Sequence, residues 1–216
     1  ALPIYPCRTG TTTTQTFTLD GTPVVTTIID ENDGALGLGA GNSLREALAA
    51  ADAGDDITFA AVLNGQTIVL NGTQLIVGKS LTVDATPLND GITITADRRS
   101  RVMTIRPGHT VELRKLNVRD GDAGTAAGGG ILNVGSDLSL WRVNAIDNRA
   151  GTAGGGIAST SGGSLTMQDS WVTSNVAGLG GGISFDGTSG GVLSIVESAA
   201  TDNSAATGGG LAMNDA

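Results

Sequence analysis

Acidic side chains recur at one repeated place in the chain, and carboxylates at such a spacing could do chemistry. Asp147 and Asp202 each precede an asparagine, and Asp120 takes the corresponding place one repeat earlier. A row of carboxylates on one outer face could bind Ca²⁺ or serve a polysaccharide lyase or hydrolase. Ser174 interrupts the row, however, and Asp side chains at turns commonly accept backbone N–H bonds. We therefore interpret the row as a turn position rather than a catalytic site.

Positive charges form a cluster and part of a second row. The segment Asp97-Arg98-Arg99-Ser100-Arg101 could hold an acidic sugar or a phosphate, but three cations in a turn between strands usually face solvent. The second row contains Lys115, Arg142, Asp169 and Glu197. We expect it to be a solvated face, with an exposed pair between Arg142 and Asp169 worth less than about 1 kcal/mol.

The residues most often used for catalysis or sugar stacking give no continuous site. His109 is the only histidine and follows Pro107-Gly108, with no Ser or Cys nucleophile motif nearby. Trp141 and Trp171 could stack on sugar rings if exposed, but they stand at non-equivalent positions of the repeat. We therefore predict no catalytic residue and no enzyme. A polysaccharide lyase or hydrolase is the alternative, and it would need several convergent acids and a base.

One loop has the composition of a Ca²⁺ site. Asp30-Glu31-Asn32-Asp33-Gly34 is rich in oxygen ligands but lacks the EF-hand spacing and its terminal Glu. Asp30, Asn32 and Asp33 are the candidate metal ligands. No other cofactor is expected.

The elements that must position these residues belong to an internal repeat. A triplet Gly-Gly-Gly followed by Ile or Leu begins at Gly128, Gly154, Gly180 and Gly208, with spacings of 26, 26 and 28 residues. A period of this size is typical of one solenoid coil. The glycines permit positive φ and close backbone approach at a tight corner.

Asparagines recur in step with the glycines, at Asn148, Asn175 and Asn203. Stacking coils about 4.8 Å apart buries a continuous core and places equivalent residues in rows. The three asparagines then form a side-chain amide ladder at a turn. By the same register, an internal aliphatic row contains Ile131, Ile157, Ile183 and Leu211. Three short strands per coil is the simplest account.

Upstream of the glycine repeat, alternating apolar residues predict further strands at 57–59, 67–70, 81–83, 92–95 and 102–105. Residues 55–216 are predicted to be the solenoid, and 1–54 an N-terminal cap packed on it, together forming one structural domain. Ser43-x-x-Glu46 predicts a capping box that begins a helix ending at Ala51. Residues 11–30 are interpreted as a hairpin turning at Asp20-Gly21, also within the cap.

The run Asn42-Ser43-Leu44-Arg45-Glu46-Ala47-Leu48, followed by Asp55-Asp56-Ile57-Thr58-Phe59, resembles the CSLREA-type N-terminal domain of bacterial surface β-helix proteins. The Gly-Gly-Gly-Ile repeats are similar to those of polymorphic outer-membrane autotransporter adhesins. The resemblance implies an all-β fold, a right-handed parallel β-helix, and a surface location with an adhesive or structural role. Asn42 departs from the family's pattern, which usually has Cys there, so a cap disulfide of some relatives is absent.

Composition narrows the function classes. The chain carries 34 glycines, 3% aromatic residues and a formal net charge of −9, which argues against a nucleic-acid partner. Charged residues make up only 15%, a balance typical of secreted bacterial surface proteins. The single Cys7 cannot form an internal disulfide, and no stretch is long and apolar enough to span a membrane. No signal peptide heads the chain.

We therefore expect an extracellular structural or adhesive module at a cell surface, with a carbohydrate-binding or polysaccharide-degrading solenoid as the alternative. Its expected partners are other copies of itself or a host or neighbouring-cell surface, with glycans among the candidate ligands. Leu211 and Met213 lie on the last predicted strand and form a candidate assembly edge for fibres. An ice-binding surface would need a repeated Thr-x-Thr row, and Thr93-Ile94-Thr95 is not repeated in register.

Overall fold

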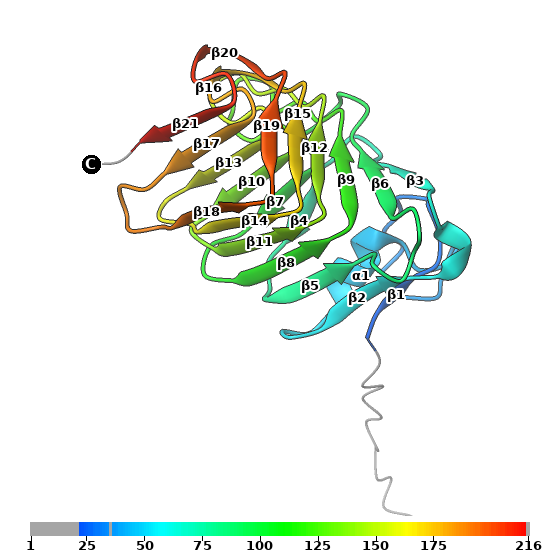
Figure 1. Ribbon diagram of the computed structural model, residues 1–216. Coiled ribbons are helices and arrows are strands. Elements are labelled where there is room, and N and C mark those ends of the chain that lie inside the picture. The colour runs from blue at the N-terminus through cyan, green and yellow to red at the C-terminus, as the bar shows by residue number, and fades with distance from the viewer. Residues whose placement is uncertain (1–21, 35, 215–216) are drawn as a thin grey trace, which may run out of the picture.

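The protein is an all-β parallel solenoid of six coils with one α-helix, seen in a computed structural model that describes residues 22–34 and 36–214 (Figure 1). Each coil gives one strand to each of three parallel sheets. Sheet A contains β1 (Val24–Val25), β2 (Asp56–Phe59), β5 (Leu81–Asp84), β8 (Thr110–Arg114), β11 (Asp137–Trp141), β14 (Leu165–Gln168) and β18 (Leu193–Val196). Sheet B contains β3 (Thr67–Val69), β6 (Ile92–Thr95), β9 (Leu116–Arg119), β12 (Asn144–Ile146), β15 (Trp171–Thr173) and β19 (Ala199–Thr201). Sheet C contains β4 (Leu75–Val77), β7 (Met103–Ile105), β10 (Ile131–Val134), β13 (Ile157–Thr160), β17 (Ile183–Asp186) and β21 (Leu211–Asn214).

The strand register confirms the rows predicted from the repeat. Ile131 lies beside Ile157, Ile157 beside Ile183, and Ile183 beside Leu211. The first three side chains are fully or almost fully buried. Successive side chains of a strand point to opposite faces, so one face of each sheet fills the core and the other faces solvent.

Most corners between sheets depend on residues with positive φ. Between sheets A and B these corner residues are Lys115, Arg142, Asp169 and Glu197; between sheets B and C they are Asp120, Asp147, Ser174 and Asp202. Their φ values lie between 47° and 59°. A corner on the outside of the solenoid favours polar residues, and left-handed backbone favours Asp and Asn among residues with a side chain. The two polar rows of the sequence are therefore rows of corner residues.

The glycine triplets form the entry to sheet C. Gly154 has φ of +62°, and a Cβ at Gly155 would lie 2.4 Å from the carbonyl oxygen of Gly181 in the next coil. The backbones of the two coils are therefore too close at Gly155 to leave room for a side chain. The glycine-rich loops also contain two strands that the sequence did not predict, β16 (Val176–Leu179) and β20 (Ser204–Thr207), which pair in parallel. Gly178 interrupts the apolar alternation of β16, and β20 contains only small or polar residues, so neither has the pattern by which strands are recognised.

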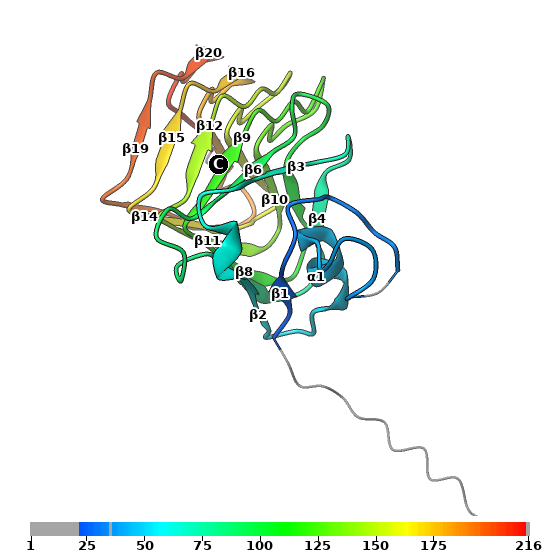
Figure 2. The same cartoon turned by 90° about the vertical axis from the view of Figure 1, so that its right-hand side faces the viewer.

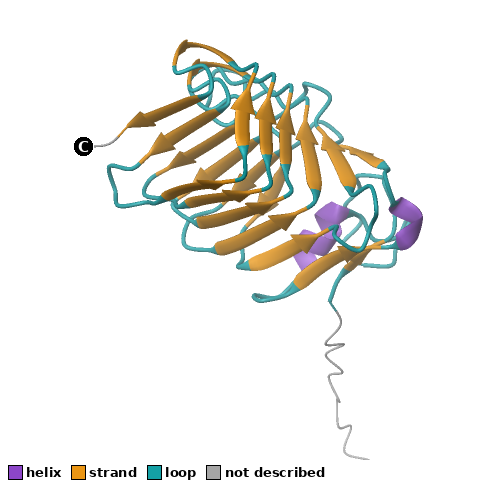
Figure 3. Cartoon of the chain, viewed as in Figure 1, coloured by secondary structure: helices purple, strands orange, loops and turns teal. Residues whose placement is uncertain are grey.

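The N-terminal end of the solenoid is covered by α1 (Leu44–Ala50), which packs near β1 and β4 (Figures 1 and 2). The other helical element is the short 3₁₀ helix η1 (Ala61–Leu63), and Figure 3 shows both helices at this end. Ser43 and Glu46 form the predicted capping box. The predicted hairpin lies mostly outside the described residues; within them, β1 pairs with β2 in parallel rather than in a hairpin.

An ion pair fixes the cap to the first coil. The guanidinium of Arg45 donates to both carboxylate oxygens of Asp30, at 2.8 and 2.7 Å, and also to the carbonyls of Thr73 and Gln74. Asp30 accepts a further bond from the backbone N–H of Asn71. The Asp30 side chain is 1% exposed, so it depends on these donors in place of water.

We predict that Asp30→Ala lowers the free energy of unfolding by about 3 kcal/mol, because it leaves a poorly solvated guanidinium without its anion. Glu112→Ala is the control, since Glu112 pairs with Arg114 at 2.7 Å where both side chains are 34% exposed. That change should cost less than about 1 kcal/mol. Urea denaturation of both variants measures the difference, and equal losses would contradict the role given to Asp30.

Glu46 makes the cap sensitive to acid. Burial raises the pKa of Glu46, but hydrogen bonds from Ser43 and Asp33 together lower it by more than burial raises it. The net pKa therefore lies below its ordinary value of 4.5. A lowered folded-state pKa stabilises the protein above the ordinary value, and that stabilisation is lost as the pH falls through the folded pKa. We predict that Glu46→Gln lowers the melting temperature near neutral pH and flattens its decline below pH about 4.5. Parallel melts across this range measure the effect; identical pH profiles for both proteins would refute it.

Candidate functional site

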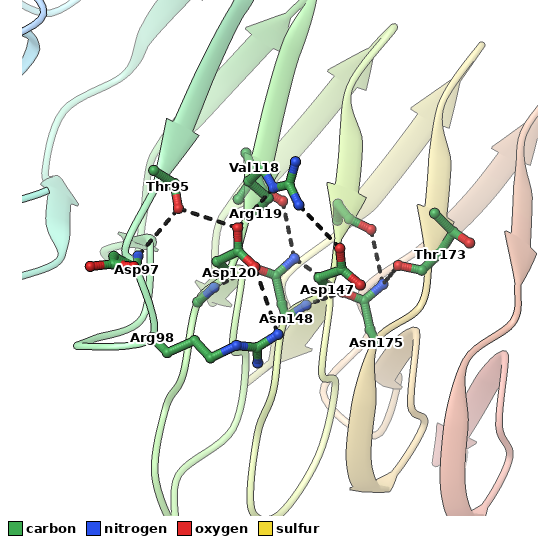
Figure 4. Close-up of polar contacts among 12 residues, drawn as sticks. Thr95, Asp97, Arg98, Val118, Arg119, Asp120, Asp147, Asn148, Thr173 and Asn175 are labelled. Carbon is green, nitrogen blue, oxygen red and sulfur yellow. Dashed lines mark hydrogen bonds and ion pairs between the residues drawn. The ribbon is translucent and has the colours of Figure 1, made fainter. Parts of the chain in front are cut away.

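The three predicted asparagines lie in one column at the corner between sheets B and C, and Figure 4 shows two of them, Asn148 and Asn175. The side-chain amide of Asn148 donates to Oδ1 of Asn175 at 3.0 Å, and that of Asn175 donates to Oδ1 of Asn203 at 3.0 Å. The same two oxygens accept the backbone N–H groups of Asn148 and Asn175. Each amide therefore pairs with the next coil through side chain and backbone.

Each asparagine of the ladder also donates to a carbonyl of sheet B in the preceding coil. The acceptors are Val118 for Asn148, Ala145 for Asn175 and Val172 for Asn203. Asn148 and Asn175 are almost completely buried. The ladder is therefore a structural element that joins consecutive coils, and a ligand at the surface could not reach Asn148 or Asn175.

Two carboxylates of the acidic row, Asp120 and Asp147, pair with an arginine from sheet B (Figure 4), whereas Asp202 is exposed. Arg119 contacts Asp120 at 2.8 Å and Asp147 at 3.2 Å, so a cation bridges the two carboxylates. Asp120 also lies 3.7 Å from Arg98 and accepts from Thr95 Oγ1 at 3.4 Å. We expected these carboxylates to accept backbone N–H bonds at their turns. Instead, they pair with side chains. Carboxylates held in this way are poor candidates for a Ca²⁺ row or a general base.

In the arginine cluster before β7, Arg98 and Arg99 are exposed as predicted, whereas Arg101 is partly buried. Arg101 donates to the carbonyls of Ala127 and Gly128 in the next coil, both at 2.6 Å, and to Gln74 Oε1 at 2.7 Å in the preceding one. Arg99 donates to the Leu70 carbonyl. These guanidiniums connect coils, so the cluster does not present three free cations to an acidic ligand.

The candidate metal loop is part of the cap. Both carboxylate oxygens of Asp30 are engaged by Arg45, Asn32 is exposed, and the backbone N–H of Asp33 donates to Glu46. Among residues 22–34 and 36–214, no three His, Cys, Asp or Glu side chains are grouped as metal ligands. Asp30 therefore has a structural role in this loop, and metal binding by Asp30, Asn32 and Asp33 stays a prediction.

The candidate assembly edge lies on the last coil. Met213 is 54% exposed, whereas Phe185, its neighbour in the preceding coil, is 2% exposed. Ile195 is 41% exposed and its neighbour Met167 only 1%. Leu211 is partly buried against the core. The side chains that fill the core in one coil are thus partly uncovered in the next.

A pocket of about 440 Å³ lies on the outer face of sheet B, beside its corner with sheet A. We call it the Trp171 pocket. Its lining consists of Asn89, Asp90, Lys115, Asn117, Arg142, Asn144, Asp169 and Trp171. One strand position in three successive coils contributes to this lining: Asn117, Asn144 and Trp171 lie side by side. Thr93 precedes them in the same column but does not line the pocket.

Sequence reasoning missed this pocket, although the spacing contained a signal. Asn117, Asn144 and Trp171 follow one another at intervals of 27 residues, which is one coil. Arg142 was expected to pair with Asp169; instead its guanidinium carbon lies 4.6 Å from the ring centre of Trp141. This cation–π contact leaves Asp169 to face the pocket.

No protein-family model, curated protein or solved structure matches the chain. The structure by itself shows a repeat protein with a parallel β-solenoid fold. Neither helix in the described part of the chain has the length and apolar character needed to cross a bilayer.

We predict that Asn175→Ala lowers the free energy of unfolding by about 1–3 kcal/mol, because it removes the partners of the buried Asn148 amide and of the Ala145 carbonyl. Ser174→Ala is the control, since Ser174 is exposed and makes no side-chain hydrogen bond within the described residues. Thermal and urea melts of the two variants compare the positions. Equal, negligible losses would mean that the ladder does not stabilise the coils.

Proposed function

We propose that this protein is a structural and adhesive β-solenoid module of an extracellular surface, as its resemblance to CSLREA-type surface proteins implies. The observation that carries the proposal is the structural use of its charged and polar rows. The amide ladder, Arg101 and Arg119 each join neighbouring coils. Such cross-links suit a rigid rod that presents side chains at fixed spacing.

A catalytic role has less support. Arg119 holds the two neighbouring carboxylates that could have formed an acidic centre, and His109 lies in the turn before β8, where its backbone N–H donates to Ser136. A polysaccharide lyase or hydrolase would need acids and a base that converge on one substrate position. We therefore propose binding rather than turnover as the activity of the outer faces.

Self-association through the solenoid ends is part of the proposed function. The last coil offers unpaired backbone groups along β18, β19 and β21, together with the exposed side chains of Ile195 and Met213. Exposed strand edges pair readily with another chain. We propose a second copy of this chain as the partner at that edge.

We predict that the 216-residue chain associates with increasing concentration and that Met213→Lys reduces this association, because a charge at the edge opposes burial against another copy. Thr166→Lys, on the exposed outer face of β14, is the control and should leave association unchanged. Static light scattering across a concentration series measures the mass. A strictly monomeric chain at high concentration would refute end-to-end association.

Adhesion is tested separately. Fluorescently tagged protein should be retained on a panel of bacterial and host-cell surfaces, and loss of tertiary structure by Asp30→Ala should reduce retention at temperatures that unfold the variant. No retention on any surface would contradict the adhesive role.

A further inference from the structure

We infer that the Trp171 pocket binds a neutral saccharide, with one sugar ring stacked on Trp171 and its hydroxyl groups bonded to Asn144, Arg142 and Asp169. The inference deepens the proposed adhesive function, on which it rests, by naming the ligand class and the site. It uses groups that the contacts described above leave free: the exposed face of the Trp171 indole, the Asn144 Oδ1 oxygen and the Asp169 carboxylate.

The indole of Trp171 is presented as a platform. It is 50% exposed and stands at the start of β15, with Asn144 beside it in one neighbouring coil and Ala199 in the other. The methyl group of Ala199 is too small to cover an indole. An aromatic ring fixed on a sheet loses little conformational entropy when a ligand covers it. A pyranose ring has an apolar C–H face that such a platform can accept.

The outer amide column ends with an open acceptor. Asn144 Nδ2 donates to Asn117 Oδ1 at 2.8 Å, and Asn117 Nδ2 lies 3.4 Å from Thr93 Oγ1. In the buried ladder, the Oδ1 oxygen of Asn175 accepts a hydrogen bond from the Asn148 side-chain amide of the coil before it. Here the side-chain amides donate toward the N-terminal coils, so Asn144 Oδ1 receives no hydrogen bond from the described residues. Asn144 and Trp171 line the same pocket.

The corner residues supply further unpaired groups. The Asp169 carboxylate and the guanidinium N–H groups of Arg142 make no hydrogen bond with the described residues, although Arg142 stacks on Trp141. Together with Asn144 they offer acceptors and donors within one pocket. Sugar hydroxyls both donate and accept, so neighbouring hydroxyls can satisfy both kinds of group at once.

The charge balance favours a neutral ligand. The pocket contains two cations, Lys115 and Arg142, and two carboxylates, Asp90 and Asp169. Lys115 Nζ already donates to the Leu88 carbonyl at 2.6 Å, and Asp90 accepts from Asn64 at 2.6 Å. An acidic sugar would gain attraction from Arg142 but meet the Asp169 carboxylate. The formal charges cancel, so the aromatic surface and the hydrogen-bonding groups determine recognition.

Titration of the 216-residue protein with neutral hexose and N-acetylhexosamine oligosaccharides tests the inference, with oligogalacturonate and a Trp-free peptide as further arms. We expect a saturable change in tryptophan fluorescence with at least one neutral oligosaccharide. Trp141→Phe, which removes the other tryptophan, should retain that change. Isothermal calorimetry should show that Trp171→Ala weakens binding by about tenfold or more and that Asn144→Ala weakens it by a smaller factor.

Three outcomes would overturn the inference: no saturable binding of any neutral saccharide, binding that Trp171→Ala leaves unchanged, or binding of oligogalacturonate or peptide alone. Melting curves must show that Trp171→Ala remains folded. If it does not, the double variant Trp171→Phe/Asn144→Ala is used in its place. Unchanged saccharide affinity of that variant would likewise refute binding at the Trp171 pocket. Retention on cell surfaces is measured in parallel. Retention without saccharide binding rejects the pocket and keeps the adhesive function, whereas loss of both rejects both.

Discussion

Parallel pairing between coils is the constraint on which the rest of the structure depends. Each strand must lie beside its equivalent in the next coil, about 4.8 Å away, so every coil has to turn its corners in nearly the same way. Residues at one position of the repeat are therefore forced into columns. A column inside the solenoid must be apolar or fully hydrogen-bonded, and the aliphatic row from Ile131 to Leu211 and the ladder from Asn148 to Asn203 are these two solutions.

The same constraint explains why so many polar residues have structural roles. Left-handed corners at Asp120 and Asp147 place two carboxylates one coil apart, where they would repel each other. Arg119 lies in the adjacent strand and compensates both. Arg101 uses its donors on backbone carbonyls of another coil. The charges that could have formed a catalytic surface are thereby used to hold coils in register.

The pocket proposed for ligand binding lies where a column changes its residue type. Along the outer face of sheet B, Thr93, Asn117 and Asn144 form a polar series that stops at Trp171. That change leaves an unfilled amide acceptor next to an exposed aromatic ring. In the last described coil, Met213 is exposed where Phe185 is buried in the coil before it. A break in the repeat, rather than the repeat itself, creates the Trp171 pocket.

The sequence by itself determined the coil length, the aliphatic row, the capping box at Ser43 and the alignment of Asn148, Asn175 and Asn203, because each depends on spacing along one chain. Tertiary structure decided which charges meet. The partners of Asp30 and Asp147 lie 15 and 28 residues away, on side chains whose direction no periodicity specifies. The Trp171 pocket likewise combines residues from several coils and from two adjacent positions of each coil. Such a combination depends on the depth and angle of a corner, which packing fixes only after the coils have stacked.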